Sequence, residues 1–276
     1  MSEERYPILS AIAVRAIAAA ALASALCAPA APRPATPSAE RLDWSVWWCP
    51  PGAWKARVDL KLDEIRKGPG RYDIVFVGDS ITQNWEGWCE KNDIVKVARL
   101  YSDGKLAYPN GPGRAVWDEM RRRHRLLNIA MAGDTTQHAL WRLQNGELEG
   151  YVAKGVVLMP DWANEDPPED VAAGVKAILE RIAEYQPQAI TLLMPILPCG
   201  EQKDDPRRLR IERINALIKP FADGRRVVWF DICAHFLDQD GNVRRDLMPD
   251  FQHPLGKGYG VWRDALLPYF KSICKR

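Results

Sequence analysis

Two spacings of apolar residues alternate along the chain from about residue 72 onward. Five short runs are apolar at nearly every position, which is typical of strands buried on both faces; they span residues 74–77, 126–131, 156–159, 189–196 and 227–232. After them, apolar residues recur at helical spacing and predict helices over residues 135–146, 168–185, 207–221 and 258–270. This alternation predicts an α/β domain whose parallel sheet is covered by helices on both faces.

A serine follows the first predicted strand directly, in the sequence Gly78-Asp79-Ser80. In open parallel sheets, binding and catalytic sites lie at the carboxyl ends of the strands. A serine hydroxyl is a weak nucleophile and needs a base beside it. At the start of a helix, the N-terminal N–H groups also favour developing negative charge. Serine is also a frequent helix N-cap. This tripeptide alone leaves both interpretations open.

Four histidines are available as that base. Three occupy contexts that suit structural roles: His124, His138 and His235. His253 lies three residues after Asp250, in a segment that precedes the last predicted helix. A carboxylate at this position can hold the imidazole tautomer while the other ring nitrogen faces Ser80. The alternative is a polar loop whose Asp and His cap the neighbouring helix.

Three longer segments contain these residues. IVFVGDSIT contains Ser80, NIAMAGDTTQHALWRLQNGELEG contains Gly133, and MPDFQHPLGKGYGVW contains Asp250 and His253. Together they resemble the nucleophile, second and last blocks of the SGNH (GDSL-like) hydrolase family, in the branch of the platelet-activating-factor acetylhydrolase subunits. The resemblance spans roughly residues 72–270.

This resemblance implies a flavodoxin-like three-layer α/β/α sandwich with a five-stranded parallel sheet. It also implies a serine esterase that acts on small acyl esters without a metal or other cofactor. Ser80, Asp250 and His253 would form the catalytic triad, and the backbone N–H groups of Ser80 and Gly133 would form the oxyanion hole. Two alternatives stay open: a catalytically weakened relative that binds acylated carbohydrate, and an acyltransferase.

The third block of the family departs from its usual G-x-N-[DN] pattern. The corresponding segment reads Met-Pro-Asp-Trp-Ala-Asn over residues 159–164. In a gapless register, Asp161 replaces the glycine and Ala163 replaces the oxyanion asparagine. Either Asn164 serves through a shifted loop or the side-chain donor is missing, which typically costs about 10²–10³ in rate.

Eleven tryptophans are many for a chain of this length. Trp85 lies just beyond the nucleophile and Trp162 lies in the third block. Indole rings stack on sugars and on acyl chains alike, so we predict that both tryptophans, together with Asp79, contact the substrate, which favours an acetylated carbohydrate. Packing is the alternative for any single tryptophan, and residues 87–114 read as an irregular lid or rim.

The N-terminal part has the pattern of an export signal. An apolar run over residues 16–26 follows Arg5 and Arg15, and small residues suitable for cleavage end at Ala30. We therefore expect a signal peptide over residues 1–30, a Pro/Ala-rich linker over 31–41, a Trp-rich arm over 42–70 and the hydrolase domain over 71–276. This predicts a secreted or periplasmic protein; the alternative is a disordered Ala-rich leader.

Charge and cysteine content narrow the remaining choices. The net charge is +2, which gives no general electrostatic reason to expect nucleic-acid binding. The basic run at residues 121–125 is interpreted as a solvated helix end that leads into a strand. None of the six cysteines has zinc-site spacing. Cys49 and Cys89 could pair in an exported protein, or the thiols could stay free.

Overall fold

The computed structural model describes residues 35–42, 51–86, 112–160 and 165–274, all within one compact unit, Arg33–Arg276. Its centre is a five-stranded sheet with the order β2-β1-β3-β4-β5, in which all neighbours are parallel. This is the flavodoxin-like order. The strands are β1 (Arg71–Val77), β2 (Leu126–Asn128), β3 (Val152–Leu158), β4 (Ile190–Leu193) and β5 (Val227–Trp229).

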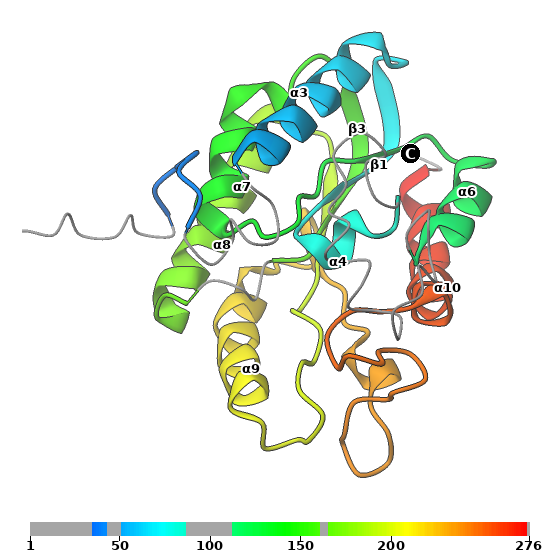
Figure 1. Ribbon diagram of the computed structural model, residues 1–276. Coiled ribbons are helices and arrows are strands. Elements are labelled where there is room, and N and C mark those ends of the chain that lie inside the picture. The colour runs from blue at the N-terminus through cyan, green and yellow to red at the C-terminus, as the bar shows by residue number, and fades with distance from the viewer. Residues whose placement is uncertain (1–34, 43–50, 87–111, 161–164, 275–276) are drawn as a thin grey trace, which may run out of the picture. The chain divides into compact units, whose positions relative to one another are not determined.

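Helices cover both faces of the sheet (Figure 1). One face is covered by α7 (Thr136–Arg142), α8 (Pro168–Tyr185) and α9 (Pro206–Ile218), with α3 (Pro51–Lys67) beyond α7. The other face is covered by α6 (Arg114–Arg121) and α10 (Gly256–Cys274). A short helix, α4 (Ser80–Gln83), lies at the carboxyl end of β1. The three-layer α/β/α sandwich predicted from the sequence is confirmed.

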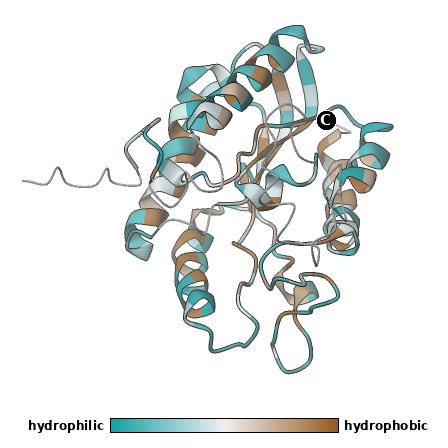
Figure 2. Ribbon diagram, viewed as in Figure 1, coloured by the Kyte–Doolittle hydropathy of each residue, from teal (hydrophilic) through white to brown (hydrophobic). Residues whose placement is uncertain are grey.

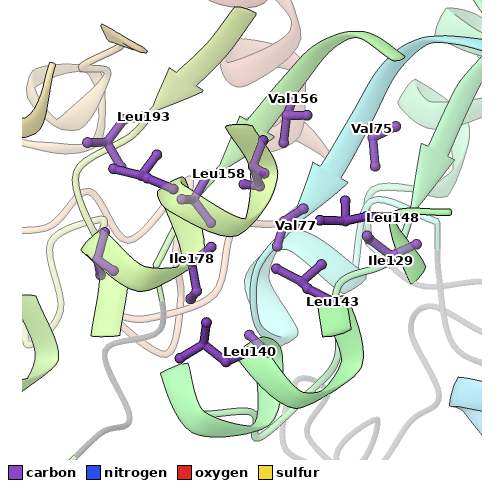
Figure 3. Close-up of a cluster of buried hydrophobic side chains, with 14 of the residues drawn as sticks. Val75, Val77, Ile129, Leu140, Leu143, Leu148, Val156, Leu158, Ile178 and Leu193 are labelled. Atoms are coloured by element: carbon purple, nitrogen blue, oxygen red, sulfur yellow. The ribbon is translucent and has the colours of Figure 1, made fainter. Parts of the chain in front are cut away.

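Alternate residues of β1 supply two separate cores. Val75 and Val77 face α7 and α8 in the cluster drawn in Figure 3, whereas Ile74 and Phe76 face the aromatic residues of α6 and α10. All four are completely buried. Burial on both faces explains why the strand is apolar at consecutive positions. In Figure 2 the strands of the sheet are mainly hydrophobic, whereas the helices carry both hydrophobic and hydrophilic residues.

One helix of the domain, α3, was not predicted from the sequence. The α3 helix buries Trp54, Arg57, Val58, Lys61 and Ile65 at helical spacing. Two of these five are basic, which conceals the apolar stripe in the sequence. Their charges are compensated by Glu86, which lies 2.6 Å from the Lys61 ammonium and 3.5 Å from the Arg57 guanidinium. The expected arm is therefore, over residues 51–67, a helix of the domain.

The limits of several strands and helices also differ from those predicted from the sequence. β1 and β3 begin earlier than their apolar runs because their first residues alternate between exposed and buried. The predicted helix 135–146 is α7 followed by a π-helical turn, Leu143–Glu147, in which Gly146 has φ 101°. α6 was not predicted; it ends at Arg121, so the basic run does follow a helix and lead into β2.

The segment before α3 contacts the domain earlier than expected. Residues up to 41 were expected to be an unpacked linker, yet the Ser38 N–H donates to the Gln137 carbonyl at 3.1 Å. The Glu40 carbonyl lies 2.7 Å from Nε2 of His138. Arg41 is buried and pairs with Asp134 at 2.8 Å. Residues 38–41 thus belong to the packed domain.

Candidate active site

Ser80 is the first residue of α4, immediately beyond β1. The cap of this helix is Asp79, whose carboxylate accepts the Ile81 N–H at 2.9 Å. A Cβ at Gly78 would lie 2.8 Å from the Met159 carbonyl, so only glycine lets the ends of β1 and β3 approach this closely. Because Asp79 serves as the N-cap, the alternative capping role for Ser80 is wrong, and its hydroxyl is available for another partner.

That partner is His253. Oγ of Ser80 lies 3.0 Å from Nε2 of His253, and Nδ1 of the same ring lies 2.8 Å from Oδ2 of Asp250. The other carboxylate oxygen accepts the backbone N–H groups of His253 at 2.8 Å and Gln252 at 3.1 Å. The structure therefore brings together the three residues expected to form the triad, from positions 173 residues apart.

The loop carrying this pair is held in an unusual conformation. Among the described residues, Phe251 is the one non-glycine residue with positive φ, at 57°. Its carbonyl accepts the Gly200 N–H at 2.9 Å, which anchors the loop to the segment after β4. A left-handed residue here turns the chain so that Asp250 and His253 face each other, and such strain is common at functional sites.

The electrostatics of Asp250 favour its ionised form. Burial by itself would raise the pKa of this carboxyl, but the hydrogen bonds and the charge of His253 outweigh burial, so the pKa lies below its usual value. An ionised carboxylate at Nδ1 fixes the tautomer in which Nε2 can accept a proton. The arrangement of Ser80, His253 and Asp250 is thus suited to general-base activation of a hydroxyl.

Gly133 lies in the loop after β2, which runs beside the end of β1. The Met131 N–H donates to the Gly78 carbonyl at 3.0 Å, and the Ala132 N–H donates to the side chain of Gln83 at 2.8 Å. Gly133 itself has φ 68°, which favours glycine. Within the described residues, neither its N–H nor that of Ser80 has an acceptor.

A buried ionic network holds this loop, and the sequence analysis did not identify it. The Asp134 carboxylate accepts Nε of Arg142 at 2.7 Å, Nε1 of Trp54 at 2.7 Å and the Arg41 guanidinium at 2.8 Å. Arg142 also donates to the Ile129 carbonyl at 2.7 Å and forms an ion pair with Glu147. The second family segment contains both Asp134 and Arg142, but only the fold shows that they form an ion pair.

Two of the residues predicted to contact substrate, Trp85 and Asp79, are buried in the structure. Trp85 is completely buried among Phe76, Trp117, Tyr259 and Trp262, so the prediction that it contacts substrate is wrong. Asp79 is also buried, and its capping bond gives it a positioning role instead. The remaining candidates, Trp162 and Asn164, lie outside the described residues, as do Asp161 and Ala163 of the altered third block.

The other histidines are away from this cluster. His138 is buried and hydrogen-bonded to Thr135 in a capping box, and burial lowers its pKa. His124 packs edge-on against Phe270, and burial likewise lowers its pKa. His235 lies in a 3₁₀ turn, Cys233–Phe236. Their expected structural placement agrees with these contacts.

A polar groove adjoins the loop of the candidate triad. Its volume is about 800 Å³, and Phe251 forms part of its wall. The Arg245 guanidinium lies 5.1 Å over the Phe251 ring. The remaining lining is rich in amide and charged side chains, including Gln202, Gln239, Asn242 and Arg244. The groove therefore presents mainly hydrogen-bonding groups beside the Phe251 ring.

Comparison with known proteins places the chain in a family. Residues 76–261 match the model of the GDSL-like Lipase/Acylhydrolase family. Platelet-activating factor acetylhydrolase IB subunit alpha2 of Rattus norvegicus is 34% identical over 189 residues, which cover 68% of this chain and 71% of that protein. The chain therefore belongs to the GDSL-like lipase/acylhydrolase family and is a GDSL-type hydrolase. This confirms the resemblance seen in the sequence.

Solved structures show the same fold. An acetyl xylan esterase, AlAXEase, matches with a TM-score of 0.51 at 16% identity, covering 71% of this chain and 98% of that one. Est24, a carbohydrate acetylesterase from Sinorhizobium meliloti, matches with a TM-score of 0.51 at 14% identity, covering 73% and 99%. Across the described residues, we find no helix with the length and apolar character needed to cross a bilayer.

Proposed function

We propose that this chain is an esterase that removes small acyl groups, of the acetyl type, from a carbohydrate alcohol. The observation that carries the proposal is the continuous hydrogen-bonded series from Ser80 through His253 to Asp250. A serine hydroxyl is a weak nucleophile until a base accepts its proton. Here the base lies at 3.0 Å and its orienting carboxylate is held by backbone N–H groups of its own loop.

The proposed reaction has two halves. Ser80 Oγ attacks the ester carbonyl while His253 takes its proton, and the N–H groups of Ser80 and Gly133 stabilise the oxyanion. The tetrahedral intermediate collapses to an acyl-enzyme, and His253 returns the proton to the leaving alcohol. Water, activated by the same histidine, then attacks the acyl-enzyme and releases the acid. Asn164 is the proposed additional oxyanion donor, and Trp162 a proposed substrate contact.

The polar groove supports a carbohydrate as the alcohol portion. Phe251 belongs both to the loop that carries His253 and to the groove wall. An apolar ring beside amide side chains and a guanidinium can bind the mixed surface of a sugar. Two proteins of the same fold are named as an acetyl xylan esterase and a carbohydrate acetylesterase, and this proposal extends that substrate class to the present chain.

The test is hydrolysis of a panel of esters by the purified chain. We expect the rate with nitrophenyl acetate to exceed that with the octanoate, and acetylated xylo-oligosaccharides to release acetate. Ser80→Ala should reduce turnover to background, whereas Ser38→Ala, which changes a half-buried serine outside the site, should keep it. Full activity of Ser80→Ala would refute the nucleophile assignment.

Two further measurements separate this proposal from its alternatives. A fluorophosphonate probe reacts readily only with an activated serine, so wild-type labelling that disappears in Ser80→Ala supports an active enzyme. An unlabelled chain that still binds acetylated sugar would support the non-catalytic alternative. Product analysis with an added sugar acceptor would reveal acyl transfer if acetyl-sugar forms in place of free acetate.

We also propose that the protein is exported. The support is the apolar run at residues 16–26 with small residues after it; residues 1–30 lie outside the described part of the chain. Expression in a bacterial host followed by mass spectrometry of the periplasmic or secreted form should show a mature N-terminus near residue 31. A full-length chain confined to the cytoplasm would contradict export.

A further inference from the structure

Three metal-binding side chains converge at the end of the sheet opposite Ser80. They are Asp73 near the start of β1, His124 in the turn before β2, and Cys274 at the end of α10. Each offers one ligand atom, and the three atoms all lie within 4.8 Å of one another. All three residues are partly buried. We propose that this cluster, the Asp73–His124–Cys274 site, binds a divalent transition-metal ion, with Zn²⁺ as the expected occupant.

The donor set favours zinc over the hard cations. A thiolate, an imidazole and a carboxylate are the three ligand types that Zn²⁺ takes, whereas Mg²⁺ and Ca²⁺ require oxygen donors. Tetrahedral zinc with its usual bond lengths separates neighbouring ligand atoms by about 3.3–3.6 Å. The three ligand atoms lie within 4.8 Å of one another, which exceeds these separations by at most about 1.5 Å, and side-chain rotation can close this difference. Three protein ligands leave the fourth position to water.

The surrounding structure already orients each ligand. The Asp73 carboxylate accepts the Arg125 N–H at 2.9 Å, which fixes the turn carrying His124 beside β1. The His124 ring packs at 4.9 Å against Phe270, one helical turn before Cys274 on α10. The Cys274 carbonyl accepts the Lys154 ammonium at 3.0 Å. Secondary contacts of this kind fix ligand geometry in metal sites.

Positive charge opposes the ion and sets its affinity. The Lys154 ammonium lies 3.4 Å from the Asp73 carboxylate. Besides burial, the positive charge of Arg123 lowers the pKa of His124. The Lys154 side chain is 43% exposed, so it can turn toward solvent when an ion takes its place. Binding breaks the S–H bond of Cys274, forms a zinc–sulfur bond and releases the proton to solvent. The bound ion would join β1, the turn before β2 and the C-terminal end of α10.

The site is independent of ester hydrolysis. Asp73 and Ser80 lie at opposite ends of β1, roughly 20 Å apart at the usual rise per strand residue. Removal of the ion should therefore leave nitrophenyl acetate turnover unchanged while lowering the unfolding temperature, since an ion that binds only the folded state stabilises it. Failure of this proposal and failure of the proposed esterase would thus be seen in different measurements.

The experiment uses the full chain, stripped with a chelator and titrated with Zn²⁺ and Co²⁺ alone. We expect one equivalent of zinc per chain and a thiolate-to-cobalt charge-transfer band. Cys274→Ser and His124→Gln should each bind at least tenfold more weakly, and Cys274→Ser should lose the band. Cys233→Ser and His235→Gln, which alter a thiol and an imidazole elsewhere, should bind as wild type does.

A further variant tests the opposing charge. Lys154→Gln removes the ammonium beside Asp73 and should tighten zinc binding severalfold. Wild-type binding by Cys274→Ser, or the absence of a charge-transfer band in the wild-type cobalt protein, would overturn the proposal. The wild-type cobalt spectrum decides the question even if a ligand variant fails to fold.

Discussion

Asp250 contacts His253 through both of its carboxylate oxygens: one lies 2.8 Å from Nδ1 of the ring and the other accepts the backbone N–H of the same residue at 2.8 Å. The two contacts define both the position of the histidine backbone and the rotation of its ring. The remaining nitrogen, Nε2, consequently points at Ser80. A carboxylate is required for this arrangement because both contacts need an acceptor.

Asp250→Asn should lower kcat by roughly 10²–10⁴ with little change in KM. The amide can accept one of the two N–H groups but must present its NH₂ to the other, which favours the wrong tautomer of His253. Steady-state hydrolysis of nitrophenyl acetate measures the effect. Asp264→Asn, an exposed carboxylate on α10, is the matched control and should retain wild-type kcat. An Asp250→Asn enzyme with unchanged turnover would remove Asp250 from the mechanism.

The same aspartate should contribute to acid sensitivity. Its pKa is lower in the folded chain than in the unfolded one, so its stabilising contribution is complete above the unfolded value of about 4 and is lost as pH falls through the folded value. Urea unfolding of wild type and Asp250→Asn from about pH 5 to pH 2 should show a stability difference that shrinks on acidification. A difference that widens toward low pH would contradict the lowered pKa.

Gly133→Ala should reduce both stability and turnover. A Cβ at φ 68° costs about 1–2 kcal/mol, and the strained loop should displace the Gly133 N–H, with a loss in kcat of up to about 10²-fold. Gly224→Ala provides a matched control, because Gly224 has φ 71° and no atom within 4 Å of an added Cβ. It should lose similar stability and keep full activity; equal activity in the two variants would argue against an oxyanion role for Gly133.

Arg142→Met should destabilise the fold by about 3–5 kcal/mol, because it leaves the carboxylates of Asp134 and Glu147 buried without their common partner. Arg213→Met removes an exposed arginine paired with Glu169 and should cost at most about 1 kcal/mol. Chemical denaturation of both variants measures the difference. Comparable small losses would mean that the buried network contributes little to stability.

The burial of Glu147 bears on the same network. Burial is the largest influence and raises the pKa of this carboxyl to about 7, although Arg142 opposes the shift. Neither the charge state nor the pairing is visible in the sequence, where Arg142 and Glu147 lie in a segment with ordinary helical character. Only the π-helical turn, Leu143–Glu147, brings the two side chains together.

Periodicity determined much of the architecture. Residues that are apolar on both faces of a strand can only be buried between two helix layers, so the five strands and the limits of α8 followed from hydrophobic spacing alone. The position of Ser80 after β1, and the Asp250–His253 spacing within one loop, were equally local features. Family-specific segments then linked positions that periodicity leaves unconnected.

Tertiary contacts decided what local patterns could not. α3 was not predicted because its buried stripe contains Arg57 and Lys61, whose burial is favourable only once Glu86 is folded beside them. Trp85 was expected to contact substrate, but four aromatic residues enclose it, three of them from segments remote in the sequence. Likewise, Asp73, His124 and Cys274 are separated by 51 and 150 positions in the sequence, and the fold alone brings them together. Charge pairing, aromatic burial and ligand convergence depend on distances between remote residues, which one sequence does not specify.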